Sequence, residues 1–285
     1  MHWLLAGCGR LGLRVADLLL QGGHRVTGLR RHWPAAGIPI GLQRCTVDLH
    51  DGSALAASVP PDVDGIIHVL TPDERSPEGY RRAYLSSLQR LLDLPQLALD
   101  KQRWLFVSST AVYGDADGAE LDETADSAPA GFNGQILLQA EDCLRQARAN
   151  AVCLRLGGIY GPGRTQLLRG LLAGTARVQR APPHWTNRVH AEDAARMLAW
   201  LVERPDTGIV NGVDGDAVSE ADLADWLCAE LGLPPPAERA ADGRANRRIL
   251  PRRLQQAGFQ WRYPDHRIGY SELIASLRQD ARPPP

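Results

Sequence analysis

The chain has 285 residues, of which 44% are hydrophobic and 23% are charged, a composition typical of a globular protein with a substantial core. Its formal net charge of -1 argues against a nucleic-acid-binding surface and against attraction to anionic lipid. The five cysteines are odd in number and form no C-x-x-C pair. This pattern predicts neither a disulfide framework nor a metal site, and it favours the reducing cytoplasm.

The first residues allow two interpretations. Leu4 to Cys8 reads LLAGC, which is similar to a bacterial lipobox, and Gly7 to Gly12 reads GCGRLG, which matches the Gly-x-Gly-x-x-Gly turn of dinucleotide-binding proteins. A secretory signal needs an apolar region of about 7–15 residues after a basic segment. Only seven residues precede Cys8, so the lipoprotein interpretation is disfavoured. We expect no membrane attachment.

The surrounding elements support the dinucleotide interpretation. An apolar strand is predicted over residues 2–6 and a helix from Leu11, followed by the Gly22-Gly23 break and a second strand over residues 24–29. In this context the first glycine permits the tight turn, the second lets the backbone approach a pyrophosphate, and the third lets the helix pack closely. The predicted phosphate-binding residues are Gly7, Gly9, Arg10, Leu11 and Gly12.

The end of the second strand indicates which dinucleotide is bound. An acidic residue there accepts a hydrogen bond from the ribose 2′-hydroxyl of NAD, whereas arginine accommodates the 2′-phosphate of NADP. This strand runs into Arg30 and Arg31. The sequence therefore predicts NADP(H) in preference to NAD(H), although two arginines in a surface loop are also consistent with simple solvated charge.

Strands and helices continue to alternate along the chain, which predicts an α/β fold with a doubly wound parallel sheet of the Rossmann type. Further strands are predicted near Val47, over 64–70, 103–109 and 151–161, with helices over 77–94 and 135–149. After Gly161 the elements become shorter, and they include a strand over 209–213. We expect a dinucleotide domain at 1–161, an interleaved smaller substrate-binding lobe at 162–280 with a surface loop at 234–246, and a disordered tail at 281–285.

Five segments together resemble the extended short-chain dehydrogenase/reductases, the family of nucleotide-sugar epimerases and dehydratases. These segments are GCGRLG, VDLHD, VSSTAVYGD, LRLGGIYGPGR and NRVHAEDAA. The resemblance implies that Asp48 and Leu49 contact the adenine, that Leu70 and Thr71 flank the cofactor, and that Ser108 and Ser109 lie near the nicotinamide. Ser109 matches the catalytic serine of that family, although serines at a strand end also serve as simple caps.

The catalytic Tyr-x-x-x-Lys pair of that family has no counterpart in this sequence. The resemblance places Asn133 at the tyrosine position and Leu137 at the lysine position. Lys101 is the only lysine, and no tyrosine lies four residues before it. Tyr113 is a candidate replacement for the proton donor. The candidate substrate-binding residues are Asn133, Arg164 and His190.

Three functions remain compatible with these residues. The first is an NADP(H)-dependent oxidoreductase or epimerase/dehydratase that acts on a small or nucleotide-linked carbonyl or hydroxyl compound. The second is a sensor or regulator that binds NADP(H) without turnover, which the missing catalytic pair favours. The third is a scaffold that has lost its ligand. Architecture alone does not separate them, and a homodimer is one candidate assembly.

Overall fold

The computed structural model describes residues 1–97 and 101–280, which group into two compact units. The first unit consists of Met1–Tyr113, Pro129–Arg155 and Ala195–Val210. The second consists of Gly114–Ala128, Leu156–Ala194 and the chain from Asn211 onward. Each unit is thus assembled from three separate segments rather than from one continuous stretch. The tail at 281–285, predicted to be disordered, lies outside the described residues.

A seven-stranded sheet forms the centre of the fold, in the order β12-β7-β5-β4-β1-β2-β3. Its strands are β1 (His2–Ala6), β2 (Arg25–Arg30), β3 (Gln43–Thr46), β4 (Gly65–His68), β5 (Arg103–Ser109), β7 (Val152–Leu156) and β12 (Gly208–Gly212). The pairings from β3 through β5 are parallel. The predicted doubly wound sheet is therefore confirmed. Its strand order reverses between β1 and β4, the position at which such sheets bind ligands.

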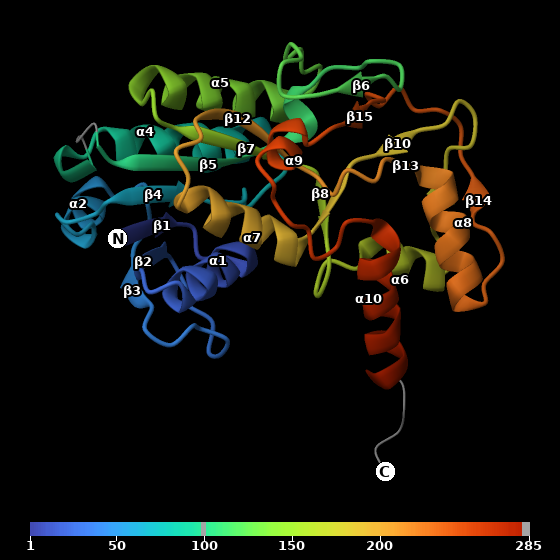
Figure 1. Ribbon diagram of the computed structural model, residues 1–285, viewed down its shortest axis with the longest axis horizontal. Coiled ribbons are helices and arrows are strands. Elements are labelled where there is room, and N and C mark those ends of the chain that lie inside the picture. The colour runs from blue at the N-terminus through green and yellow to red at the C-terminus, as the bar shows by residue number, and fades with distance from the viewer. Residues whose placement is uncertain (98–100, 281–285) are drawn as a thin grey trace. The chain divides into compact units, whose positions relative to one another are not determined.

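Helices cover both faces of this sheet, with α1 on one side and α4 and α5 on the other (Figure 1). The helical elements that accompany the sheet are α1 (Arg10–Gln21), α2 (Gly52–Ser58), α3 (Pro77–Tyr80), the π-helical turn η1 (Arg81–Ser86), α4 (Ser87–Leu92), the 3₁₀ turns η2 (Pro95–Leu97) and η3 (Thr110–Val112), α5 (Phe132–Ala147) and α7 (Ala191–Val202). Since both faces are covered, every residue of β1 is buried. This burial explains the continuous apolar run at the start of the sequence.

A glycine on β4 leaves room for a large aromatic ring of β1 at the centre of the sheet. Trp3 on β1 is fully buried and lies in register with Gly65 on β4. A Cβ atom placed on Gly65 would overlap the Trp3 indole ring. Gly65 therefore provides the space into which the ring packs.

The second unit contains shorter elements. They are β6 (Glu120–Leu121), β8 (Gly158–Tyr160), α6 (Gln166–Leu172), β9 (Arg177–Val178), β10 (Trp185–Thr186), β11 (Arg188–His190), β13 (Val218–Ser219), α8 (Glu220–Leu231), β14 (Ala237–Glu238), β15 (Arg248–Ile249), α9 (Arg252–Gln256) and α10 (His266–Asp280). The strands pair in twos, β8 with β11, β6 with β15, β9 with β14 and β10 with β13. Leu168 of α6, Leu227 of α8 and Leu273 of α10 pack into one hydrophobic cluster.

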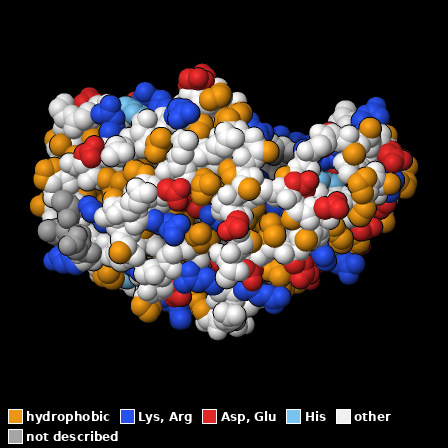
Figure 2. Space-filling model, turned by 90° about the horizontal axis from the view of Figure 1, so that it is seen from above, with side chains coloured by type: hydrophobic (Ala, Val, Ile, Leu, Met, Phe, Trp, Pro, Cys, Tyr) orange, Lys and Arg blue, Asp and Glu red, His pale blue; other side chains and the backbone are white. Residues whose placement is uncertain are grey.

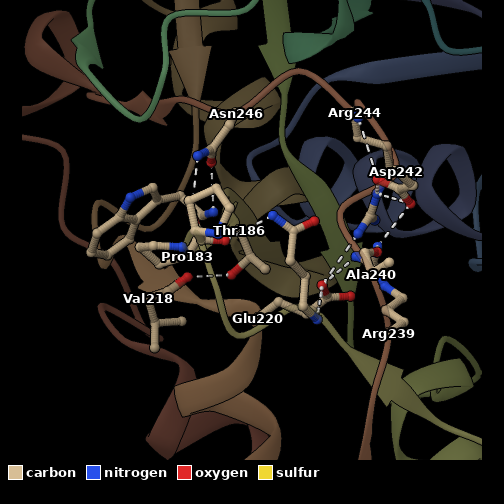
Figure 3. A network of polar contacts seen from close by, with 12 residues as sticks. Pro183, Thr186, Val218, Glu220, Arg239, Ala240, Asp242, Arg244 and Asn246 are labelled. Atoms are coloured by element: carbon tan, nitrogen blue, oxygen red, sulfur yellow. Dashed lines mark hydrogen bonds and ion pairs between the residues drawn. The ribbon is translucent and has the colours of Figure 1, made fainter.

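The predicted surface loop at 234–246 is held in place by a polar network (Figure 3). Arg239 and Arg244 both donate to the Glu220 carboxylate, at 2.6 and 3.2 Å, and both pair with Asp242 at 2.9 Å. At the end of the loop, the Asn246 side chain accepts a hydrogen bond from the backbone N–H of Trp185 and donates to the carbonyl of Pro183. The loop is thus tied to α8 and to the β10 segment.

Two features differ from the sequence-based expectations. The strand at 209–213, which the sequence assigned to the smaller lobe, is β12. It forms the edge of the central sheet beside β7. The helix expected over 77–94 is interrupted by the π-turn η1. Neither feature produces a distinctive periodicity in the sequence. A short apolar strand has the same sequence pattern whichever sheet it joins, and a π-turn adds only one residue to a helical turn.

Ser87, the residue that follows the π-turn, contacts a buried histidine. His68, the last residue of β4, is fully buried, and its Nε2 lies 2.7 Å from the hydroxyl oxygen of Ser87. The Ser87 hydroxyl donates to the Ala83 carbonyl at 2.6 Å, so His68 Nε2 must carry the proton that it shares with Ser87. His68 Nδ1 is buried and accepts no hydrogen bond. Burial lowers the pKa of His68 to about 3, which keeps the imidazole neutral in the folded protein.

This buried imidazole should make stability depend on pH. Because the folded-state pKa lies below that of the unfolded chain, the unfolded state alone binds a proton as the pH falls from about 6.5 towards 3. The free energy of unfolding should fall by up to about 1.4 kcal/mol per pH unit from this group. His68→Phe should remove that part of the slope in urea titrations between about pH 6 and 4. Ser87→Ala, which leaves the imidazole buried, should retain it, and equal slopes for His68→Phe and the wild type would contradict the assignment.

Candidate functional site

A pocket of about 560 Å³ opens in the first unit where the strand order reverses. It is formed by residues that follow the carboxyl ends of β1, β2, β3 and β4 and by residues of α3 and η1. The predicted cofactor residues that line it are Gly7, Gly9, Arg30, Arg31, Asp48, Leu49, Leu70 and Thr71. Predicted cofactor residues from four separate segments of the chain therefore line one cavity.

The glycine turn has the geometry that its sequence predicts. Gly7 has a φ of +104°, and a Cβ at this position would contact the carbonyl of Val69 and the side chain of Leu70 at 2.8 Å. A Cβ on Gly12 would overlap the carbonyl oxygen of Gly7, so α1 approaches the turn only because Gly12 has no side chain. A Cβ on Gly9 would meet nothing within 4 Å and would extend into open space.

The open space at Gly9 adjoins the N-terminus of α1. Gly9 is the N-cap residue and offers no side chain to the first N–H groups of the helix. These N–H groups and the helix dipole form an anion-binding position. The turn therefore fits a pyrophosphate, and the lack of a side chain at Gly9 leaves room for it. Arg10, Leu11 and Gly12 continue this turn as the first residues of α1.

The pocket contains three arginines, each of which contacts a different acceptor. Arg30 donates through Nη1 to the carbonyl of Cys8, within the glycine turn. Arg31 donates through Nη2 to both carboxylate oxygens of Asp73, at 2.6 and 2.8 Å. Arg82 lies 3.1 Å from the Asp48 carboxylate.

Asp48 remains anionic in this setting. Its partial burial opposes ionisation, but the backbone N–H of His50 and the nearby Arg82 together lower the pKa of Asp48 below its ordinary value. The pocket thus holds a carboxylate at the position where the resemblance places the adenine.

Several lining residues were not predicted from the sequence. They are His50, Asp73, Glu74, Glu78 and Arg82. Asp73 lies two residues beyond the predicted Thr71, so proximity in the chain is a usable signal for it. Arg82 had no such signal, because its position depends on the π-turn, a feature that is frequent at functional sites.

The predicted serines are the last two residues of β5, and their hydroxyls contact different partners. Ser109 is the N-cap of η3, and its hydroxyl oxygen accepts a hydrogen bond from the N–H of Ala111 at 3.2 Å. Ser108 is buried, and its hydroxyl donates to the Glu141 carboxylate of α5. In the structure described here, the Ser108 hydroxyl is therefore directed at a buried acid of the protein.

Glu141 belongs to a fully buried ion pair. Its carboxylate accepts from Arg155 of β7 at 2.6 and 3.0 Å, and the two side chains are 0% and 1% exposed. The Arg155 guanidinium lies 4.6 Å from the centre of the Tyr113 ring, and Tyr113 itself is 1% exposed. These contacts give Tyr113 a packing role within this cluster. Transfer of a proton to a substrate would require an access that the buried ring lacks.

The positions aligned with the missing catalytic pair lie on α5. Asn133 is half-buried near the start of the helix, whereas Leu137, one turn later, is 2% exposed and packs into the core. Leu137 and Glu141 are four residues apart and therefore share one face of α5. α5 thus presents a buried apolar side chain, Leu137, at the position where the resemblance places the lysine.

Arg164 and His190 belong to the second unit. The backbone N–H of Arg164 donates to the carbonyl of Gly161 at 2.9 Å, closing a tight turn after β8. His190 is 4% exposed, and its ring lies 3.8 Å from that of Tyr263. Its Nδ1 accepts a hydrogen bond from the N–H of Glu192, and burial lowers the pKa of His190. His190 is therefore a neutral side chain packed among aromatic rings.

Within 1–97 and 101–280, no group of three or more His, Cys, Asp or Glu side chains is arranged to hold a metal ion. In the same ranges no helix has the length and hydropathy that crossing a membrane requires. On the face drawn in Figure 2, acidic and basic side chains are interspersed, in agreement with the small net charge.

Removal of one partner of the buried pair should be costly, because the remaining charge keeps no counterion in the core. Glu141→Ala should lower the free energy of unfolding by about 3–5 kcal/mol. The double variant Glu141→Leu, Arg155→Met should recover most of that loss, since it leaves no buried charge. Urea unfolding followed by circular dichroism measures both, and a double variant as unstable as Glu141→Ala would contradict this account.

Comparisons with known proteins agree with this fold and pocket. Residues 3–213 match the model of the NAD dependent epimerase/dehydratase family. Protein YeeZ of Escherichia coli K12 is 31% identical over 274 residues, covering 92% of this chain and 96% of YeeZ. The human epimerase family protein SDR39U1 is 26% identical over 302 residues, covering 94% of this chain and 98% of the relative.

Solved structures show the same similarity in three dimensions. A structure from Methylobacillus flagellatus, described as an NAD-dependent epimerase/dehydratase, is 31% identical and superimposes with a TM-score of 0.80, covering 97% and 98% of the two chains. The structure of human SDR39U1 with NADPH has a TM-score of 0.73 at 23% identity, covering 93% and 96%. The glycine turn, the strand order and these matches lead to one conclusion, that the chain belongs to the NAD dependent epimerase/dehydratase family.

Proposed function

We propose that this protein binds NADP(H) in the pocket of the first unit and uses it as an oxidoreductase or epimerase/dehydratase-like enzyme on a small or nucleotide-linked carbonyl or hydroxyl compound. One observation carries the proposal. The glycine turn and the two arginines at the end of β2 line the same cavity, at the reversal of strand order. A pyrophosphate and a 2′-phosphate would thus find matching groups within one pocket.

The residues present fit a dinucleotide. The N-terminus of α1 and Gly9 would hold the pyrophosphate, and Arg30 and Arg31 would hold the 2′-phosphate, because guanidinium groups pair with phosphate through two hydrogen bonds. Asp48 and Leu49 would flank the adenine. The nicotinamide supplies or accepts a hydride when bound. Both forms of the cofactor occur among similar structures, since human SDR39U1 was solved with NADPH and a Thermus thermophilus UDP-glucose 4-epimerase with NAD.

Catalysis would require a proton route that differs from the Tyr-x-x-x-Lys pair. Ser109 is half-buried at the end of β5, and its hydroxyl would hydrogen-bond the substrate oxygen that gains or loses a proton. Leu137 is buried and apolar, so α5 supplies no cation at that position. This feature favours the second candidate, a sensor that binds NADP(H) without turnover.

The cofactor preference is tested by titrating the protein with NADPH and NADH while following tryptophan fluorescence. Wild type should bind NADPH more tightly, and Arg30→Ala with Arg31→Ala should weaken NADPH binding at least about tenfold, as expected for two lost charge-assisted contacts. NADH binding should change much less. Arg44→Ala removes an exposed arginine of β3 that does not line the pocket and serves as the control. Equal affinity for both nucleotides in the wild type would contradict the assigned preference.

A measurement of NADPH consumption distinguishes the proposed enzyme from the proposed sensor. The absorbance of reduced nicotinamide should fall when NADPH and a suitable carbonyl compound are added, and Ser109→Ala should lower that rate by about a hundredfold, the cost typical of a lost transition-state hydrogen bond. The NADPH affinity of the Ser109→Ala variant should stay close to that of the wild type. Tight NADPH binding without consumption against a broad carbonyl panel would instead support the sensor.

A further inference from the structure

An ion pair crosses the rim of the cofactor pocket. Arg31 Nη2 lies 2.6 and 2.8 Å from the two carboxylate oxygens of Asp73, and the side chains are 46% and 61% exposed. Both residues line the pocket. The pair is therefore accessible to solvent and to any ligand that enters.

The pair also joins two walls of the pocket. Arg31 directly follows β2, and Asp73 lies in the segment after β4. In the sheet, β2 and β4 are the two neighbours of β1, which leads into the glycine turn. The contact between Arg31 and Asp73 thus connects the segments on either side of the strand that carries the phosphate-binding turn.

The two arginines at the end of β2 differ in what they contact. Arg30 donates to a neutral acceptor, the Cys8 carbonyl, within the glycine turn. Arg31 is paired with a carboxylate, an anion that a guanidinium binds in the same way as a phosphate. A 2′-phosphate that reaches Arg31 must therefore compete with Asp73, and its negative charge is repelled by that carboxylate. A 2′-hydroxyl has no charge and meets no such competition.

We propose that Asp73 is a specificity-determining residue, an electrostatic latch on Arg31 that the 2′-phosphate of NADP(H) must displace. This inference rests on the proposed function. In the protein without cofactor the latch neutralises the guanidinium and holds the segments after β2 and β4 together. When the cofactor binds, Arg31 exchanges the Asp73 carboxylate for the 2′-phosphate. Asp73 thereby reduces the preference for NADPH over NADH that the arginines alone would give.

Neutralisation of Asp73 tests the latch. Asp73→Asn should tighten NADPH binding by about threefold to tenfold, the range expected for removing one competing surface ion pair and its repulsion. NADH binding should change less than about twofold, since its adenosine ribose carries no 2′-phosphate. The dissociation constants are measured by isothermal titration calorimetry with each nucleotide. The gain should shrink as salt rises from about 50 mM to about 500 mM, because exposed charges are then screened.

Matched variants identify the partner of Asp73. Glu74→Gln removes the same charge from the next residue of the pocket, which forms no ion pair with Arg31 in the described structure, and should produce less than half of the gain. In an Arg31→Ala background, Asp73→Asn should no longer raise NADPH affinity. Unchanged or weaker NADPH binding by Asp73→Asn, or an equal gain from Glu74→Gln, would overturn the latch while leaving the proposed function intact. Absence of nucleotide binding by the wild type and all variants would instead overturn the proposed function, and the latch with it.

Discussion

The close approach of α1 to the turn after β1 is the constraint on which the pocket depends. Gly12 brings the helix so near that a single methyl group would overlap the Gly7 carbonyl, and Gly7 itself adopts a positive φ beneath Val69 and Leu70. With both positions free of side chains, the N-terminus of α1 points at the space beside Gly9. An anion-binding helix end is thereby fixed to the strand at which the sheet reverses its order. The remaining pocket residues surround this junction.

Buried charge and polarity organise the surroundings of that junction. Glu141 and Arg155 form an ion pair with almost no exposure, and Ser108 donates to the same carboxylate. His68 at the end of β4 is kept neutral and bound to Ser87, directly after the π-turn. These contacts fix the ends of β4 and β5, the strands that lead to Leu70 and Ser109. Groups so deeply buried tolerate little displacement, because each loses its partner when the elements shift.

The electrostatics of the pocket are balanced rather than uniformly positive. Arg31 is paired with Asp73 and Arg82 with Asp48, while Arg30 contacts a backbone carbonyl. In the proposed recognition of a 2′-phosphate, Arg31 would therefore exchange one partner for another. The free energy gained from a new charge-assisted contact is reduced by the contact that is given up. The proposed cofactor preference therefore depends on these existing ion pairs as well as on the number of arginines.

The sequence by itself determined the fold class and the glycine turn, because periodicity and glycine spacing are local properties of the chain. The resemblance of its motifs to a known family added Asp48, Leu49, Leu70 and Thr71, which also line the pocket. The tertiary structure decided the rest. It placed β12 in the central sheet, turned Ser108 towards Glu141, and brought Arg82 and Asp73 into the pocket. Arg31 and Asp73 are 42 positions apart and meet only because β2 and β4 are the two neighbours of β1. Such contacts depend on strand order and on the phase of a helix after a π-turn, and neither property can be read from local periodicity.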